Sequence, residues 1–548
     1  MDTLQKDECM IIQSPATPCF EELFNLPVLV SVAAAIASTS DLTPQEQAVV
    51  QAHAAPVSSD LVKFAVDAIR AGTDPLGAAY CIVKSPKERR DTGQTFTPIE
   101  AVTGMYSWAE AQGEVARIVD PGAGSGRYVL YGLRRNANAV GVAVETDPLV
   151  ALLLRANAEA LGLTHRLQIH LGDYRTLELD SIDGRTLFIG NPPYVRHHDI
   201  EPHWKEWYSS SLKALGHASS QLAGLHLHFF LKTLSLAKQG DLGCFITAAE
   251  WLDVNYGQSL RDLLTNGLGG RAVFVVSPEV SVFGDAMVTA CITCFAPGAN
   301  TETIEFKNIA SATELLDLSG GHYAEKSRAK SERSWSILLR NTDVARNEGF
   351  VSLGDFFQVR RGQVTGMNRV WVMKDNNRFG LPEEFLVPSI TDAADIIHAP
   401  NNRIDDPSVL KRVVALPASF DELSDHKRGA ILDFLEWARS EDADKGFVAR
   451  NRKPWWRVNM TSIPQVVVTY MGRRPPVFAI NTAGAGLINV AHGLYPKVAL
   501  DPDALEWLVR WLNSNIRQES GRVYAGGLTK FEPSEVMRLQ VPGIPMLG

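Results

Sequence analysis

Cysteine is scarce in this chain, which has six cysteines among its 548 residues. Only Cys291 and Cys294 stand close together, within the apolar segment ACITCF, and no second pair accompanies them to complete a zinc site. The pattern therefore favours a structural role for both thiols and predicts no bound metal. Few cysteines in so long a chain are also typical of a protein of the reducing cytoplasm.

The sequence also lacks a long apolar run. The segment from Leu26 to Ala37 is apolar, but it is shorter than the roughly 20 residues that a helix needs to span a bilayer. The charges before it, which include Asp7, Glu21 and Glu22, have the wrong sign for a signal peptide. We therefore expect a buried helix here, with no membrane association and no export.

Basic residues are not in excess, because 53 lysines and arginines face 62 aspartates and glutamates, which gives a formal net charge of -9. This balance argues against indiscriminate binding to polyanions, although net charge does not describe a local surface. Between Lys445 and Leu500 the chain has eight basic residues and no acidic one. That segment is predicted to contact phosphate groups.

The length of the chain predicts more than one domain. Residues 1–85 have helical patterns, including Thr43-Pro44-Gln45-Glu46, which has the residues of a helix N-cap, a first-turn proline and a capping box. Between residues 86 and 300, β-branched runs alternate with helical segments, the pattern of an α/β domain with a doubly wound parallel sheet. Residues 301–345 are predicted to be a polar linker, and residues 346–548 a second domain with aromatic and basic segments.

Seven strands are expected in the α/β domain, at residues 115–119, 139–144, 167–170, 186–189, 243–247, 272–276 and 288–295. Helices are expected at residues 148–161 and 221–238, each followed closely by a glycine. The last two strands follow one another without a helical crossover, which predicts an antiparallel hairpin at the edge of the sheet.

The first candidate for ligand binding is the segment IVDPGAGSG at residues 118–126, an apolar strand that runs into a glycine-rich turn. Glycines such as Gly122 and Gly124 let the backbone approach a ligand at the carboxyl end of the first strand. Asp120 ends that strand and is a further candidate for cofactor binding. A nucleotide-binding dehydrogenase starts similarly, so the motif alone does not identify the ligand.

Acidic residues follow the next two strands as well. Glu145 ends the second strand, where a carboxylate can accept hydrogen bonds from both ribose hydroxyls of an adenosine group. Asp173, after the third strand, can accept a hydrogen bond from the adenine amino group, and Tyr174 can lie on the adenine ring. Each acid alone is also compatible with a loop or capping residue, but their joint placement at successive strand ends favours a nucleotide site.

The most informative motif is Asn191-Pro192-Pro193-Tyr194, directly after the strand expected at residues 186–189. The two prolines fix the backbone and have no N–H, so the carbonyl groups form a rigid set of acceptors. The Asn191 side-chain oxygen and the Pro192 carbonyl can both accept from an exocyclic amine, orienting its nitrogen lone pair toward a methyl group. Tyr194 offers a ring face to the planar ring that carries the amine.

These motifs resemble those of the TaqI-like gamma-class N6-adenine DNA methyltransferases of type II restriction-modification systems, most closely over residues 85–300. The family order is a threonine-proline motif, here TGQTFTP at residues 92–98, then the glycine-rich turn, the two acids, NPPY and a later aromatic residue. The resemblance implies a Rossmann-like catalytic domain, S-adenosyl-L-methionine as cofactor and a C-terminal target-recognition domain. It also implies that Thr97 contacts the methionine part of the cofactor and that Phe283 sandwiches the target base against Tyr194.

The implied reaction is methyl transfer to N6 of an adenine that has flipped out of double-stranded DNA, without a metal or a covalent enzyme intermediate. His197 and His198 follow the motif and are alternative candidates for a base, but the proton can leave through the acceptors of Asn191 and Pro192. A loop or phosphate-contact role is therefore favoured for both histidines. The family implies a monomer that methylates a short recognition sequence, while a cognate restriction endonuclease acts as a separate protein.

Three segments of the C-terminal domain resemble parts of the target-recognition domain in this family: RRGQVTGMN from residue 360, which resembles the segment that opens it, RKPWWR from residue 452 and GGLTK from residue 526. Lysine and arginine can bind phosphates or read guanine edges, and the sequence does not separate these roles. For any single residue, a solvated basic surface is the alternative. The candidate DNA-binding residues are Arg361, Arg452, Lys453, Arg457 and Lys530.

Three other functions are compatible with parts of this pattern. Methylation of cytosine N4 presents the same amine geometry, but such enzymes more often have serine or aspartate at the position of Asn191. Methyltransferases of RNA or of protein glutamine share the NPPY tetrapeptide, but they are usually shorter and lack an aromatic and basic partner domain. A DNA-binding module without enzymatic activity is disfavoured by the intact set of cofactor positions.

Overall fold

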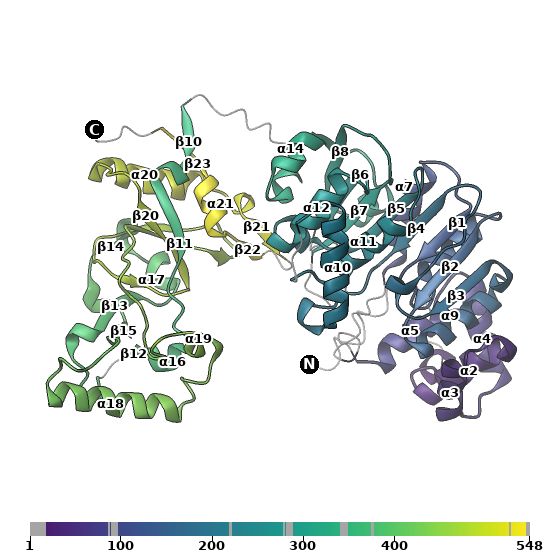
Figure 1. Cartoon of the computed structure of the whole chain (residues 1–548), viewed down its shortest axis with the longest axis horizontal. Coiled ribbons are helices and arrows are strands. Elements are labelled where there is room, and N and C mark those ends of the chain that lie inside the picture. Colours follow the sequence, from purple (N-terminus) through teal and green to yellow (C-terminus); the bar gives the residue numbers. More distant parts are fainter. Residues whose placement is uncertain are drawn as a thin grey trace. The chain divides into compact units, whose positions relative to one another are not determined.

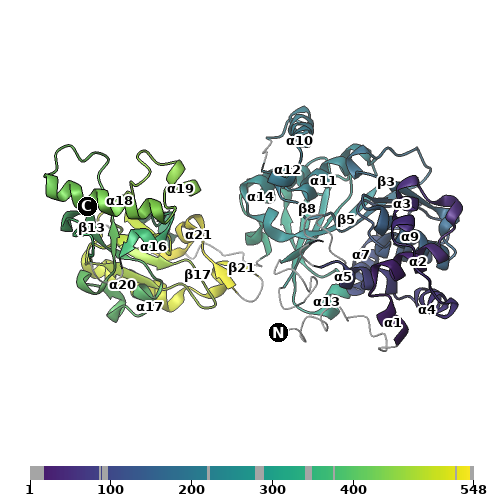
Figure 2. The same cartoon turned by 90° about the horizontal axis from the view of Figure 1, so that it is seen from below.

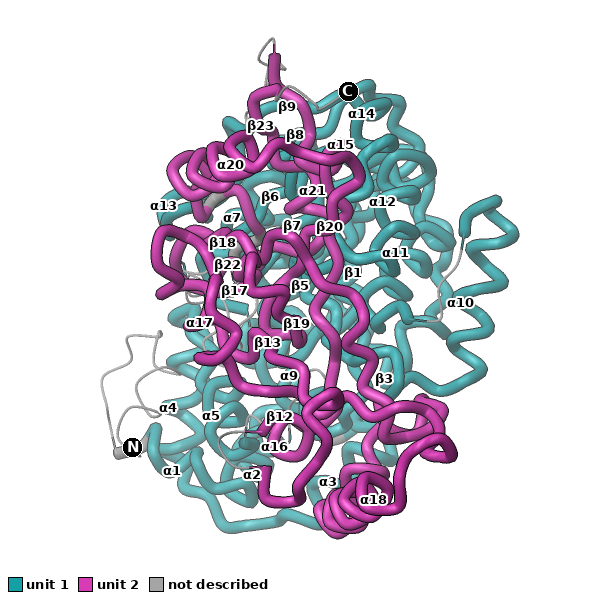
Figure 3. Tube along the Cα trace, turned by 90° about the vertical axis from the view of Figure 1, so that its left-hand side faces the viewer, with its two compact units in different colours: residues 1–341 teal, residues 342–548 magenta. Residues whose placement is uncertain are grey.

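The computed structural model describes residues 18–85, 88, 97–218, 222–277, 280, 289–339, 349–373, 377–524 and 528–543. The chain divides into two compact units, residues 1–341 and residues 342–548 (Figures 1 and 3). None of the helices in the described ranges is long and apolar enough to cross a membrane.

The first unit contains a nine-stranded sheet with the order β3-β2-β1-β4-β5-β7-β6-β8-β9 (Figure 1). Strands β1 to β5 are parallel to one another. Neighbouring residues such as Ile118 and Val119 of β1 belong to two different buried clusters, so both faces of the sheet are covered. The predicted doubly wound, Rossmann-like α/β sheet is confirmed. The seven expected strands are β1 Arg117–Asp120, β2 Val140–Glu145, β3 Leu167–Leu171, β4 Thr186–Gly190, β5 Leu242–Ala248, β6 Gly270–Val276 and β7 Ala290–Phe295.

Helices pack on both faces of this sheet (Figure 2). One face is covered by α7 Ile99–Glu110, α8 Arg127–Arg135, α9 Pro148–Ala160 and α13 Ala312–Leu316. The other is covered by α10 Pro202–Ala214, α11 Leu225–Leu236, α12 Gln258–Thr265 and α14 Lys326–Ser331. The two helices expected from the sequence are α9 and α11, and the glycines after them, Gly162 and Gly240, have positive φ angles of 69° and 93°.

The antiparallel hairpin is present, because β6 pairs with β7, but it does not form the edge of the sheet. The sheet continues through β8 Thr303–Ile309, which is parallel to β6, and ends at β9 His322–Glu325. The linker predicted for residues 301–345 was therefore wrong, since those residues supply two strands and two helices of the first unit. Strand β8 alternates buried and more exposed residues, so its polar composition concealed a half-buried strand.

The described part of the N-terminal region, residues 18–85, is helical as predicted. The capping box of α3 is formed, because the Thr43 N–H donates to Glu46 Oε2 at 2.7 Å and the Glu46 N–H donates to Thr43 Oγ1 at 3.3 Å. These helices share one buried cluster with Leu149, Leu152 and Leu153 of α9, so they belong to the first unit and are not a detached extension. They are α1 Pro18–Glu22, α2 Leu26–Ile36, which is the predicted apolar helix, α3 Pro44–Ala52, α4 Ser59–Arg70 and α5 Pro75–Val83.

The second unit contains a five-stranded sheet with the order β11-β20-β16-β18-β14 and a four-stranded sheet with the order β12-β15-β13-β19. Two smaller sheets have the orders β17-β22-β21 and β10-β23. The strands are β10 Phe350–Ser352, β11 Phe357–Arg361, β12 Val372–Met373, β13 Leu386–Ile390, β14 Arg403–Ile404, β15 Arg412–Val414, β16 Val466–Thr469, β17 Met471–Gly472, β18 Phe478–Asn481, β19 Gly486–Leu487, β20 Ala491–Pro496, β21 Arg522–Tyr524, β22 Leu528–Lys530 and β23 Gln540–Pro542.

Helices complete the hydrophobic clusters of this unit. Several of the aromatic residues that distinguish the region in the sequence, such as Trp371 and Phe434, are core residues. Trp455 and Trp456 of the RKPWWR segment pack against the same cluster. The helices are α15 Leu353–Phe356, α16 Asn368–Trp371, α17 Ala394–Ile397, α18 Asp425–Ser440, α19 Phe447–Arg450, α20 Pro502–Asn515 and α21 Pro533–Arg538.

Candidate functional site

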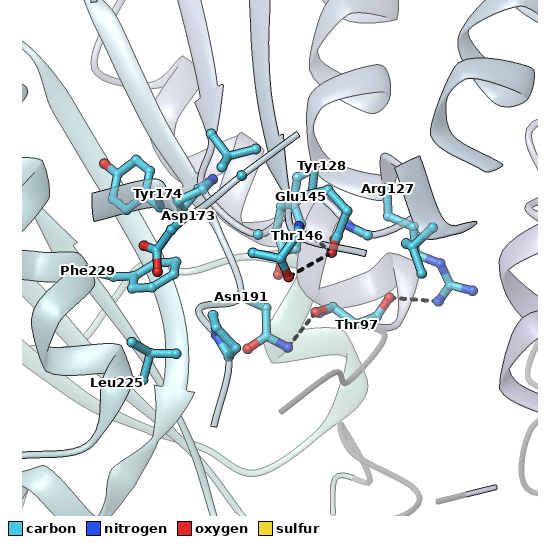
Figure 4. Close-up of a pocket in the computed structure, with 18 residues that line it drawn as sticks. Thr97, Arg127, Tyr128, Glu145, Thr146, Asp173, Tyr174, Asn191, Leu225 and Phe229 are labelled. Carbon is cyan, nitrogen blue, oxygen red and sulfur yellow. Dashed lines mark hydrogen bonds between the residues drawn. The ribbon is translucent and has the colours of Figure 1, made fainter. Parts of the chain in front are cut away.

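A pocket opens at the carboxyl ends of β1 to β4, where ligands bind in doubly wound sheets (Figure 4). It encloses about 870 Å³ of space, its open mouth included. Asp120 is the one predicted cofactor-binding residue that does not line it. The other seven are Thr97, Gly122, Gly124, Glu145, Asp173, Tyr174 and Asn191.

The glycine-rich turn brings backbone to the pocket. Gly126, the residue before α8, has a φ of 96°, and a Cβ atom there would come within 2.4 Å of the Leu154 side chain. Glycine is therefore required at this position. Gly124 has a φ of 54°, and its N–H donates a hydrogen bond of 3.0 Å to Oε2 of Glu145. The turn after β1 is thus joined to the end of β2.

Glu145 is held in one orientation by backbone N–H groups. Besides Gly124, the N–H groups of Thr146 and Asp147 donate to Oε1 at 2.8 and 3.0 Å. Burial raises the pKa of Glu145, and the hydrogen bonds from these N–H groups act in the opposite direction. The carboxyl group is therefore fixed at the pocket wall, which is the placement expected of a ribose-binding acid.

Asp120 has a different position from the one expected. Its side chain is fully buried, and a Cβ atom on Gly190 would come within 2.8 Å of its Oδ1, so it packs against the end of β4. Burial raises the pKa of Asp120 to about 8, and the negative charge of Glu145 contributes to this shift. We interpret Asp120 as a support of the turn from within the sheet and not as a wall of the pocket.

Asp173 is held by Arg175, a partner that the sequence analysis did not identify. Arg175 donates from Nη2 to Asp173 Oδ2 at 2.5 Å and from its backbone N–H to Oδ1 at 2.8 Å. Burial opposes the ionisation of Asp173, but the hydrogen bonds and charge of Arg175 outweigh it and lower the pKa of Asp173. The guanidinium of Arg175 also lies over the ring of Trp204 in α10, 4.0 Å from its centroid. Asp173 is therefore an ionised acceptor at the pocket wall.

The apolar wall of the pocket includes Phe229 and Leu225 of α11, which the sequence analysis missed (Figure 4). Tyr174, which was expected to lie on the adenine ring, is 1% exposed, and its hydroxyl is 2.9 Å from Oγ1 of Thr233. The Tyr174 and Phe229 ring centroids are 5.0 Å apart. Tyr174 is thus held in the core, and Phe229 adds a second aromatic ring to this wall. The dense apolar run LHLHFFL, at residues 225–231, was the available signal.

Asn191 and Thr97 meet at the pocket, although they come from different parts of the chain. The Asn191 Nδ2 donates to Thr97 Oγ1 at 3.2 Å, and the Thr97 carbonyl accepts from Nη1 of Arg127 at 3.0 Å (Figure 4). Asn191 and Thr97 are 9% and 2% exposed. The structure therefore brings together the two residues that the sequence assigned to the amine and to the methionine part of the cofactor.

The other two predicted catalytic residues of the NPPY motif, Pro192 and Tyr194, differ in their exposure. Pro192 is buried, and Tyr194 is partly buried with its hydroxyl donating to the Ile246 carbonyl at 3.5 Å. The ring centroid of Tyr194 is 6.5 Å from that of His226 in α11. Neither Pro192 nor Tyr194 is among the residues that line the pocket. Phe283, the predicted second aromatic residue, lies outside the described residues.

The two histidines after the motif are in a short turn, His197–Asp199. Nε2 of His198 is 3.5 Å from Oδ2 of Asp199, and these side chains are 58% and 61% exposed. This exposure of His198 agrees with the predicted loop or phosphate-contact role. A catalytic base would be expected to lie buried beside Asn191.

Cys291 and Cys294 are both fully buried in β7. Sγ of Cys294 is 3.5 Å from Sγ of Cys244, and burial raises the pKa of Cys291 to about 12. The predicted structural role of these thiols agrees with this environment. Within the described ranges, no group of three or more histidine, cysteine, aspartate or glutamate residues is placed to hold a metal ion.

In the second unit, two of the predicted DNA-binding residues share one carboxylate. Arg361 of β11 forms an ion pair with Glu532, and Nζ of Lys530 is 2.6 Å from Oε1 of the same side chain. Burial opposes the ionisation of Glu532, but the hydrogen bonds from Lys530 and Arg361 outweigh it and lower the pKa of Glu532. The negative charge of Glu532 therefore offsets part of the positive charge of Arg361 and Lys530. These two residues contribute less positive charge to the surface than the sequence suggests.

The three basic residues of the RKPWWR segment differ in their surroundings. Arg452 donates to the carbonyl groups of Thr365, at 2.9 Å, and Val364. It thus joins this segment to RRGQVTGMN, another of the segments that the sequence analysis singled out. Lys453 and Arg457 are exposed. Arg361 is exposed as well, although it pairs with Glu532, so these three side chains are the accessible ones among the predicted DNA contacts.

The pocket suits the predicted cofactor, S-adenosyl-L-methionine. Glu145 is fixed at the end of β2, the position expected of a ribose-binding acid, Asp173 is an ionised acceptor, and Phe229 adds an aromatic ring to the wall. Thr97 lies beside Asn191, where the methyl-bearing part would be held. The residues present therefore fit the group.

Comparison with known proteins gives consistent matches. A family model described as type II methyltransferase M.Eco57I, C-terminal domain, matches residues 338–547, and one described as Eco57I restriction-modification methylase matches residues 181–270. Type II methyltransferase M.XamI of Xanthomonas campestris pv. amaranthicola is 45% identical over 474 residues, 86% of this chain and 88% of that protein. Type II methyltransferase M.AccI of Acinetobacter calcoaceticus is 23% identical over 472 residues, 82% of this chain and 85% of that protein. The solved structure of the type IIG restriction endonuclease BpuSI covers 95% of this chain and 70% of its own, with 15% identity and a TM-score of 0.47.

Proposed function

Because the chain belongs to the type II DNA methyltransferases of restriction-modification systems, which use S-adenosyl-L-methionine, we propose that it methylates N6 of adenine in a short duplex sequence. One observation carries the proposal. The Asn191-Pro192-Pro193-Tyr194 motif directly follows β4, and Asn191 lies in the cofactor pocket with its amide held by Thr97.

The proposed reaction depends on the acceptor groups of this motif. When bound, the cofactor supplies an electrophilic methyl group on a sulfonium. The hydrogen bond from Nδ2 to Thr97 fixes the orientation of the Asn191 amide, and Oδ1 is the acceptor of that amide. Oδ1 and the Pro192 carbonyl accept the two N–H groups of the adenine amine, which directs its lone pair toward the methyl group. After the transfer the methylated amine loses one proton, which leaves toward water through the hydrogen bonds to these acceptors.

Positioning is the main source of rate in such a reaction, and it can supply roughly 7 to 11 kcal/mol at best. The adenine must leave the duplex, at a cost of about a few kcal/mol. We propose that Tyr194 and Phe283 offset this cost by sandwiching the flipped base. The anchoring of the Tyr194 hydroxyl on the Ile246 carbonyl supports this role, because it limits movement of the ring.

We propose that the second unit is the target-recognition domain and that the exposed Lys453 and Arg457 are among its DNA contacts. The match of residues 338–547 to the C-terminal domain of a type II methyltransferase supports this assignment. The proposal includes a monomer that methylates one strand at a time, as the family resemblance implies. The modification would protect the recognition sequence from a separate cognate endonuclease.

The proposal is tested by incubating the full chain with tritiated S-adenosylmethionine and duplex DNA, followed by nucleoside analysis. Asn191→Ala is the inactive variant, and Asp60→Asn, which changes an exposed acid in the first turn of α4, is the control. Label in N6-methyladenine that is lost only in Asn191→Ala is expected. Label in N4-methylcytosine would move the substrate to cytosine, and label that enters RNA or protein but not DNA would overturn the proposal.

A further inference from the structure

The N-terminus of α5 is fastened to the glycine-rich turn by a single carboxylate. Asp74 is the N-cap of α5, and its Oδ1 accepts from the Gly77 N–H at 2.9 Å. Its Oδ2 accepts from Oγ of Ser125 at 2.6 Å and from Nε of Arg127 at 2.8 Å. Nδ2 of Asn157, in α9, donates to Oδ1 at 3.1 Å. One side chain thus joins three segments of the first unit.

This contact leaves no room for a larger residue in the first turn of α5. A Cβ atom on Gly77 would come within 2.2 Å of Oδ2 of Asp74 and within 2.6 Å of Oγ of Ser125. Ser125 is 1% exposed, and the side chains of Asp74 and Arg127 are 14% and 21% exposed. The helix and the turn are therefore packed closely, around hydrogen bonds that are largely shielded from water.

A second contact ties α5 to the loop after β2. The Tyr80 hydroxyl donates to Oδ2 of Asp147 at 3.2 Å. The N–H of Asp147 in turn donates to Oε1 of Glu145, the predicted ribose-binding acid. The same helix therefore contacts both of the loops that form the ribose side of the pocket.

We infer that Asp74 is a positioning residue for S-adenosyl-L-methionine, acting from the N-terminal helices through the glycine-rich turn. The Asp74 carboxylate accepts hydrogen bonds from Ser125 and Arg127. Arg127 lines the pocket, and so does Gly124, the residue before Ser125. Because the inference concerns cofactor binding, it holds whichever base the enzyme methylates.

The contact network extends from Asp74 to the proposed reaction centre. Arg127 donates from Nε to Asp74 and from Nη1 to the Thr97 carbonyl, and the Thr97 hydroxyl accepts from Asn191. Figure 4 shows the part of this chain of contacts from Arg127 to Asn191. Loss of the carboxylate charge would release the Arg127 side chain at one end, so both the turn and Thr97 would lose a fixed partner.

The test uses Asp74→Asn in the full chain. Asparagine is also a good N-cap, so α5 keeps its start, but the amide replaces one carboxylate oxygen with a donor that cannot accept from Ser125 and Arg127. The Kd for S-adenosylhomocysteine is measured by calorimetry without DNA, with the thermal midpoint as a second readout. Asp60→Asn, an exposed acid in the first turn of α4, is the matched control.

We expect Asp74→Asn to raise the Kd about tenfold or more, as for loss of charge-assisted hydrogen bonds, while Asp60→Asn leaves it unchanged. In turnover, KM for the cofactor should rise far more than kcat falls. A Kd within twofold of wild type, even with a lower thermal midpoint, would overturn the inference and leave Asp74 a structural residue.

If Asp74→Asn does not fold, two smaller changes decide the question. Ser125→Ala and Tyr80→Phe each remove one hydroxyl, and each should weaken S-adenosylhomocysteine binding by about two- to tenfold. Unchanged binding in both variants would also contradict the inference. Because no DNA is present, the result does not depend on the identity of the methylated base.

Discussion

The Nδ2 atom of Asn191 donates a hydrogen bond of 3.2 Å to Oγ1 of Thr97, 94 positions earlier in the chain. One residue follows β4 and the other precedes α7. The bond joins the proposed acceptor of the target amine to the residue expected beside the methionine part of the cofactor. Under the proposed function, this bond would fix the amine and the methyl group relative to each other.

Thr97→Val removes this acceptor while it keeps the size and branching of the side chain. Loss of one neutral hydrogen bond is worth about 0.5 to 1.5 kcal/mol, so kcat/KM for the cofactor should fall by about two- to tenfold. Thr97→Ser keeps the hydroxyl and should retain most of the activity. Steady-state methylation of duplex DNA measures both variants. Equal activity of the valine and serine variants would show that the hydrogen bond does not matter.

Three polar residues of the pocket could be placed from the sequence because they lie at strand ends. Glu145 ends β2, and Asp173 and Asn191 closely follow β3 and β4, and the carboxyl ends of such parallel strands meet at one edge. Topology alone therefore brings these residues together. The same reasoning placed Asp120 at the pocket, but it does not say which way a side chain at a strand end points.

Glu145→Gln tests the fixed carboxylate. The variant loses the charge that the N–H groups of Gly124, Thr146 and Asp147 stabilise, and one of its side-chain atoms becomes a donor facing a donor. Hydrogen bonds to charged groups contribute about 1.5 to 3 kcal/mol, so the Kd for S-adenosylmethionine should rise by about 10- to 150-fold.

Calorimetry with S-adenosylmethionine measures this change. The control is Glu159→Gln, which changes an exposed residue near the C-terminal end of α9. A variant of Glu145 that binds as tightly as the control would exclude the proposed contact with ribose.

The parts of the site that the sequence did not reveal depend on packing between distant elements. Phe229 lies in a helix that is apolar on most sides, so the pattern predicts burial but not the neighbour. Arg175 and Asp74 act through side-chain hydrogen bonds, and neither belongs to a recognised motif. Toward the edge of the sheet, β8 alternates buried and more exposed residues, but this pattern covers a single strand. The polar composition of the segment favoured a linker instead.

The second unit offers a contrast between two arginines of one segment. Arg457→Ala should weaken DNA binding at all sequences and reduce the dependence of log Kd on log salt concentration by about one. Its side chain is exposed, so the free energy of unfolding should not change. Arg452→Ala leaves the carbonyl groups of Val364 and Thr365 without this donor, and should cost about 1 to 3 kcal/mol of stability.

Fluorescence anisotropy with labelled duplex at several salt concentrations and urea unfolding separate the two effects. Lys453→Ala, also exposed, should behave like Arg457→Ala. The assignment fails if Arg457→Ala unfolds more readily while its salt dependence stays that of the wild type.

Asp120 should make the stability of the chain depend on pH. In the folded chain its pKa is raised from 3.8 to about 8 by burial, so between these values the folded state keeps a proton that the unfolded state has lost. The free energy of unfolding therefore falls as pH rises, by at most about 1.4 kcal/mol per pH unit from this group.

In Asp120→Asn the side chain does not titrate. Measured by urea unfolding without cofactor, the variant should gain stability relative to wild type from about pH 4 to about pH 8, and the difference should be constant above that range. Asp60→Asn, whose side chain is exposed, should show no such trend, and a difference for Asp120→Asn that is independent of pH would show that Asp120 is ionised in the folded chain.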